Sequence, residues 1–172
     1  MTKRLKIIIC LCVVSLIIIA LIPKNVDEIS NAVVNDNNGD IAFSYLDFSG
    51  RISMLRICLF SKDGEELFSK GIFSDGGSHA RMLFYENNLC IYEGRTGKTY
   101  SFDRNGNVCD VNVSVEAIKS TGTFRGWKTS FGRKTYSLNG YLYCYESPHI
   151  FKHRAYITIK NDEQVKTVYS SS

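Results

Sequence analysis

The chain has 172 residues, of which 44% are hydrophobic and 22% charged, and its 21 Lys and Arg against 17 Asp and Glu give a net charge of +4. This length is enough for one domain with a full hydrophobic core and too short for two such domains. The basic excess does not indicate nucleic-acid binding, because three cations precede residue 7 and the remainder carries 18 basic and 17 acidic residues.

The N-terminus has the pattern of a membrane anchor. Residues 1–6 contain three cations and no acid, and residues 7–22 are apolar except for Ser15. With Leu5 and a snorkelling Lys6, the segment reaches roughly 27 Å, just enough for a hydrocarbon core of about 30 Å. We expect a cytoplasmic stub, a transmembrane signal-anchor helix over residues 7–22, and an extracytoplasmic remainder of a single-pass cell-membrane protein.

A cleaved signal peptide is the alternative interpretation of the N-terminus. Its apolar region would be about 7 to 15 residues long, with small residues before the cut. The apolar run here is longer, and the nearest small-x-small pair, Ser30 and Ala32, lies far from its end. The pattern therefore favours an anchor that is retained.

A polar tether is predicted over residues 23–40, because its final run of Asn, Asp and Gly at residues 35–40 favours turns and cannot pack. Residues 41–172 are predicted to form the extracytoplasmic domain.

This domain is predicted to be mostly β, an antiparallel meander of hairpins that is propeller-blade-like or sandwich-like. Apolar and β-branched runs alternate with Gly, Asn and Asp, and no amphipathic helix of any length is evident. Asp-Gly and Asn-Gly pairs at 63–64, 105–106 and 139–140 are the strongest short-range hairpin signals. The runs expected to be strands are 41–48, 52–60, 67–73, 82–85, 89–92, 99–102, 108–115, 136–138, 141–145, 155–159 and 165–169.

The hairpins repeat. Residues 59–65 align with residues 101–107, and a looser third copy occupies residues 158–165, at spacings of 42 and 57 residues. Periods of about 40 to 50 residues built from hairpins are typical of propeller blades. The run 97–108 resembles the inner hairpins of bacterial β-propeller repeat proteins, and the resemblance covers about 130 residues.

This resemblance implies about three blade-like units, fewer than the four or more blades of a propeller. Either the units form a curved sheet folded on itself, or copies of the chain assemble into an oligomer. The resemblance implies no ligand residues, because the repeat contains only turn and core positions.

Four cysteines lie beyond the anchor. Cys58, Cys90, Cys109 and Cys144 sit in apolar runs and form no CxxC motif, which favours free thiols, with one incidental disulfide left open. No cofactor or metal is predicted, because no phosphate loop or helix-borne ligand set is evident.

The candidate binding segment is the aromatic and basic stretch 124–134. Arg and Lys beside aromatic rings can pair with anionic groups and stack on sugars. The alternative is ordinary strand alternation, with the tryptophan in the core and the cations outside. The candidate residues are Arg125, Trp127, Lys128, Phe131, Arg133 and Lys134.

Charge is distributed unevenly along the chain. Residues 24–118 have a net charge of −5 and residues 119–172 a net charge of +6. This asymmetry indicates an electropositive end facing an anionic surface or polymer, unless the two halves interleave in the fold.

The sequence favours a membrane-anchored binding module without evident chemistry, which recognises a protein, a glycan or an anionic envelope component. A structural subunit of an envelope complex is the alternative. An enzyme whose site assembles only in the fold is a third reading, weakened by the absence of paired-carboxylate, Cys/His or metal-spaced motifs.

Overall fold

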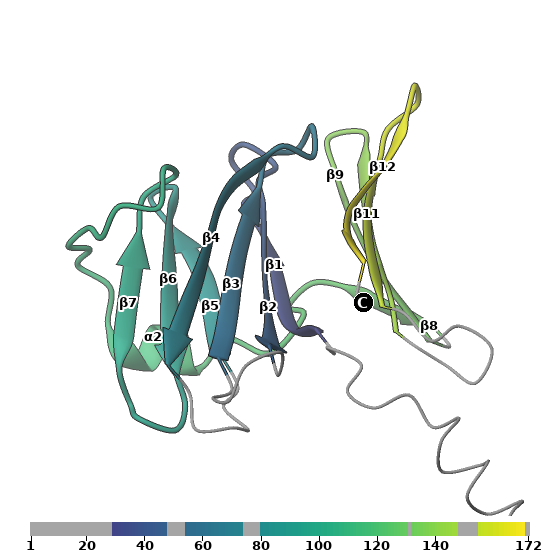
Figure 1. The fold of residues 1–172 in the computed structure, drawn as a ribbon. Coiled ribbons are helices and arrows are strands. Elements are labelled where there is room, and N and C mark those ends of the chain that lie inside the picture. Colours follow the sequence, from purple (N-terminus) through teal and green to yellow (C-terminus); the bar gives the residue numbers. More distant parts are fainter. Residues whose placement is uncertain (1–28, 48–53, 74–79, 131, 148–154, 171–172) are drawn as a thin grey trace, which may run out of the picture.

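The computed structural model describes residues 29–47, 54–73, 80–130, 132–147 and 155–170, which form three antiparallel sheets (Figure 1). Sheet A has the order β1-β2-β3-β4: β1 (Ile29–Val34), β2 (Ile41–Asp47), β3 (Met54–Phe60) and β4 (Glu66–Phe73). Sheet B has the order β5-β6-β7: β5 (Ala80–Tyr85), β6 (Asn88–Glu93) and β7 (Thr99–Phe102). Sheet C has the order β12-β11-β10-β9-β8: β8 (Lys128–Ser130), β9 (Arg133–Leu138), β10 (Tyr141–Glu146), β11 (Tyr156–Lys160) and β12 (Val165–Ser170).

Sheet A is the middle layer and is buried on both faces (Figure 1). Successive side chains of a strand point to opposite faces of its sheet. In β2 and β3, Phe43 and Cys58 therefore pack toward sheet C, whereas Ala42 and Ile57 pack toward sheet B. The consequence is two hydrophobic cores that share one sheet between them.

Short turns with left-handed residues set the hairpin registers. In the turn 61–65, Ser61 N–H donates to Glu65 O and Gly64 N–H donates to Ser61 O. The turn 103–107 repeats both hydrogen bonds, from Asp103 N–H and from Gly106 N–H. The sequence repeat therefore corresponds to one turn geometry used twice.

Helix α2 (Val115–Lys119) covers the face of sheet B that points away from sheet A. Its N-cap, Ser114, accepts a hydrogen bond from Ala117 N–H, and its Ile118 is buried. Lys119 lies over the ring of Tyr92, with Nζ 5.1 Å from the ring centroid. The helix is five residues long.

The expected antiparallel, mostly β fold is confirmed, but three segments differ from expectation. Residues 29–34, assigned to a polar tether, form β1, because their apolar side chains enter the core around a single buried asparagine. The run 108–115 does not form a strand beyond one bridge from Val108 to Phe102. Strand β8 was not predicted, since the residues Lys-Thr-Ser carry no apolar pattern.

The described residues contain no helix long and apolar enough to cross a bilayer. The expected stub and anchor, residues 1–22, and the first part of the expected tether, residues 23–28, lie outside the described residues. All four cysteines of the domain are free, as the sequence favoured, and burial raises the pKa of the Cys58 thiol to about 11.

We predict that alanine at Gly106 destabilises the domain more than alanine at Gly140. Both glycines have positive φ, +80° and +81°, a conformation that costs other residues about 1 kcal/mol. A β-carbon at Gly106 would lie 2.9 Å from Phe68 Cγ, whereas at Gly140 it would have no neighbour within 4 Å. Chemical denaturation of the two variants measures the difference, and equal losses would contradict a close approach at Gly106.

Candidate functional site

The segment 124–134 does not present its predicted binding residues on one surface. Trp127 is 8% exposed and packs edge-on against Phe124, with ring centroids 5.6 Å apart. Its indole Nε1 finds no hydrogen-bond acceptor among the described residues. The tryptophan is therefore a core residue, and it lies just before β8 rather than within a strand.

The basic side chains of this segment do not share one surface either. Lys134 Nζ lies 3.7 Å from the centroid of the Phe124 ring, on the core side of sheet C. Arg133, the preceding residue of β9, points to the opposite face, where its Nε donates to Cys144 Sγ (2.8 Å) and lies 3.8 Å from Glu146. Arg125 and Lys128 are exposed, and Phe131 lies outside the described residues.

The charge asymmetry, in contrast, coincides with the layers of the fold. Sheets A and B come from residues 29–102 and sheet C from residues 128–170, so the strands of the two halves do not interleave. Hydrogen bonds join the halves where they meet. Tyr136 donates to Asp36, Tyr141 donates to Asp63, and Lys166 Nζ donates to the Asp63 carbonyl oxygen.

Six turns of the described chain gather at one end of the molecule, where hairpin tips of all three sheets are visible (Figure 1). They are the turns at residues 35–40, 61–65, 86–87, 103–107, 139–140 and 161–164. Most are rich in Asn, Asp and Gly, which suit turns because they tolerate positive φ or bond their own backbone. The side chains of this end come from segments far apart in sequence.

A cavity of about 450 Å³, which we call the turn groove, opens between the turns of sheets A and C. Its polar lining residues are Asn37, Asn38, Asp40, Lys62, Asp63, Arg104, Asn139, Tyr141 and Tyr143. The volume falls within the range of about 300 to 1,000 Å³ that is usual for small-molecule sites.

An ion pair between Asp40 and Arg104 forms one wall of the turn groove. Arg104 donates to both Asp40 oxygens, from Nε at 2.7 Å and from Nη2 at 3.1 Å. The Asp40 side chain is 2% exposed, and Asn38 donates a further hydrogen bond to it. The bond to Asp40 raises the pKa of Arg104, so the guanidinium stays charged and fixed in place.

Tyrosines form the opposite wall of the turn groove. Tyr141 donates from its hydroxyl to Asp63 Oδ1 (3.3 Å), and Lys62 Nζ lies 5.6 Å from the centroid of the Tyr141 ring. Tyr143 donates to the Gly39 carbonyl oxygen (2.6 Å), and burial raises its pKa. The groove thus holds two cations, Lys62 and Arg104, against the two carboxylates, and its lining is neutral overall.

A second cavity of about 450 Å³, the inner cavity, lies on the other side of the turn 35–40. It is lined by residues of β1, β5 and β9 and by Arg125, and Asn37 borders both cavities. The Tyr136 hydroxyl in this cavity donates to Asp36, and that bond, together with burial, raises the pKa of Tyr136 to about 12. Arg125, a candidate of the basic segment, lines this cavity.

Sequence reasoning missed the turn groove. Most of its residues come from four turns and the others from β9 and β10, and each turn, taken alone, indicates only a hairpin connection. The order of the predicted strands could have indicated it, because alternate turns of an antiparallel meander lie at the same end of the sheet. Among the described residues, no group of three or more His, Cys, Asp and Glu could hold a metal ion.

No protein-family model matches the chain, and no curated protein sequence matches it significantly.

We predict that Trp127→Ala destabilises the domain by about 3 to 5 kcal/mol, the usual cost of removing a buried aromatic side chain. Lys128→Ala is the matched control, because its side chain is exposed on the next residue. Denaturant titration of the two variants gives the free energies of unfolding. A Trp127→Ala protein as stable as the control would contradict the burial of this side chain in the core.

Proposed function

We propose that this protein is a binding module that recognises a neutral glycan in the turn groove. The observation that carries the proposal is the composition of that groove. One cavity combines side-chain amides, tyrosine hydroxyls, an aromatic ring and a balanced set of charges.

The polar groups of the groove suit a ligand with many hydroxyls. Amide and hydroxyl groups both donate and accept hydrogen bonds, which matches a sugar, whose hydroxyls do the same. Asn37 and Asn139 are exposed and border the cavity, so their amides are within reach of a ligand. Because Lys62 and Arg104 are offset by Asp40 and Asp63, the groove gives a strongly anionic polymer little electrostatic advantage.

The arrangement of the carboxylates favours binding over hydrolysis. Glycoside hydrolysis ordinarily uses two carboxyl groups on either side of the scissile bond, one of them a proton donor. In the turn groove, Asp40 is held by Arg104 and Asn38, and Asp63 accepts from Tyr141. Both carboxylates therefore already serve to hold the walls of the groove.

We also propose that the three sheets are related to the blades of a β-propeller. Two of the turns share one geometry, and β1, β5 and β9 all border the inner cavity, as the inner strands of propeller blades border a central channel. The three sheets do not form a closed ring, which a propeller of four or more blades would.

The proposal also places the domain on the outer side of a cell membrane, held by residues 7–22. The support is the uninterrupted apolar run and the three cations that precede it. A glycan of the cell envelope would then lie within reach of the groove.

Glycan binding is expected to depend on Tyr141 and Lys62. The full-length chain in mild detergent is screened against a panel of neutral and acidic envelope oligosaccharides, and titration calorimetry gives affinities for those that bind. Tyr141→Ala should weaken binding at least about tenfold, equivalent to about 1.4 kcal/mol, because the ring and its hydroxyl are both lost. Tyr141→Phe, which keeps the ring, should lose less.

Lys128→Ala serves as the control, since this exposed lysine lies on β8, outside the turn groove. Thermal stability is measured for every variant, so that a loss of binding is not confused with a loss of folding. The proposal fails if no neutral glycan binds, or if folded Tyr141→Ala and Lys62→Ala proteins bind as tightly as the unaltered chain.

A further inference from the structure

Strand β7 leaves part of its outer edge unpaired. Lys98 O accepts a hydrogen bond from Glu93 N–H, so the backbone groups of residues 98, 100 and 102 point toward β6. Successive residues of a strand point their N–H and C=O groups to opposite edges. Those of Thr99 and Ser101 therefore point outward, away from sheet B.

The chain begins to cover this edge and then turns away. Val108 forms a bridge with Phe102, and Cys109 N–H donates to Ser101 O (3.0 Å). Val113 N–H then bonds back to Val111 O (2.8 Å), a tight turn that leads the chain to α2. Within the described chain, the outward groups of Thr99 and the N–H of Ser101 are left without a backbone partner.

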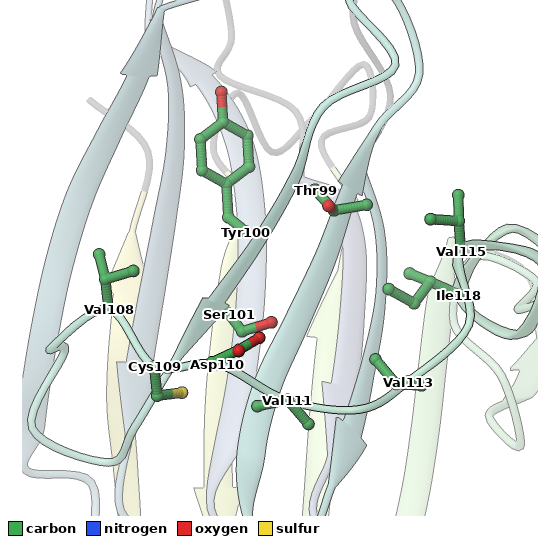
Figure 2. Close-up of a pocket in the computed structure, with 10 residues that line it drawn as sticks. All are labelled: Thr99, Tyr100, Ser101, Val108, Cys109, Asp110, Val111, Val113, Val115 and Ile118. Carbon is green, nitrogen blue, oxygen red and sulfur yellow. The ribbon is translucent and has the colours of Figure 1, made fainter.

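A cavity of about 230 Å³, which we call the edge groove, fills the space between β7 and this diverging segment. Figure 2 shows Thr99 and Ser101 on the strand, with Val113, Val115 and Ile118 on the other side of the cavity. Its lining is aliphatic apart from the strand edge, Cys109 and a single charged side chain, Asp110. Thr99 is exposed and Val115 is 39% exposed, so the groove opens to solvent.

We propose that the edge groove binds an extended peptide segment of a partner protein, which adds to sheet B as a strand beside β7. Backbone groups that alternate along an open strand edge are matched by another peptide backbone, and an adjacent apolar pocket selects alternate side chains. The peptide carries aliphatic residues at alternate positions and a Lys or Arg that lies near Asp110, the one charge in the lining. The inference is independent of the glycan proposal, since the two sites share no residue.

Two other occupants fit less well. The chain's own segment contacts the edge only at Val108 and Cys109, and the turn 111–113 and the buried Ile118 of α2 direct the rest of it away from Thr99. The β7 edge of a second copy would bring its own segment 108–113 with it, which is more chain than a cavity of about 230 Å³ accommodates.

The experiment selects ligands for the full-length chain, in mild detergent, from a display library of random linear peptides. Selected peptides should share the aliphatic-x-aliphatic pattern with a neighbouring cation. Thr99→Pro removes an outward N–H that β6 does not use, and should weaken binding at least about tenfold. Thr99→Val keeps that N–H and should bind normally, and Asp110→Lys should reject the cationic peptides.

Amide hydrogen exchange of the unaltered chain gives a readout that does not depend on any variant. The Ser101 amide should exchange fast in the free protein and at least about tenfold more slowly with a selected peptide bound. The proposal is overturned by a failure to select peptides, by peptides that bind Thr99→Pro equally well, or by no slowing at Ser101. A Ser101 amide that is already slow without peptide would also overturn it, because the edge would then be closed by the chain itself.

Discussion

The side chain of Asn31 joins sheets A and B and the segment that leads into sheet C at one buried point. It lies on β1 of sheet A, is 1% exposed, and donates from Nδ2 to the Ala80 carbonyl oxygen at the start of sheet B (3.1 Å). Its Oδ1 accepts from Phe124 N–H (2.8 Å), in the segment that leads into sheet C. Because unmet polar groups in a core cost about 1 to 3 kcal/mol each, this junction specifies how the layers meet.

The turn that follows β1 extends this junction to the end of the molecule where the six turns gather. Its side chains and backbone bond to Asn87 in the β5–β6 turn and Arg104 after β7, both next to sheet B, and to Tyr143 of sheet C. At Gly39 a β-carbon would lie 2.8 Å from the Tyr143 hydroxyl, so this contact requires glycine. The turn groove and the inner cavity lie on either side of this turn and owe their shape to it.

The sequence was sufficient for the class of fold but not for the junction or the site. Ten of the predicted runs became strands because Asp-Gly and Asn-Gly turns and alternating apolar residues act locally. The junction was missed because residues 23–40 were assigned to a polar tether, and the role of Asn31 depends on two partners far away in sequence, Ala80 and Phe124. The run 108–115 has the composition of a strand, yet its cap at Ser114 and the burial of Ile118 favour a turn and a helix. Trp127 was assigned to a candidate surface because neighbouring cations resemble a binding segment, whereas its burial depends on Phe124 and sheet C.

Replacement of Asn31 tests the claim that this one side chain holds the three layers together. Asn31→Leu keeps a similar volume but leaves the Phe124 N–H and the Ala80 carbonyl unpaired, so the free energy of unfolding should fall by at least about 2 kcal/mol. Asn105→Ala, at an exposed position of the turn 103–107, is the control and should unfold at the same denaturant concentration as the unaltered chain. An Asn31→Leu protein that unfolds at that concentration as well would contradict the account.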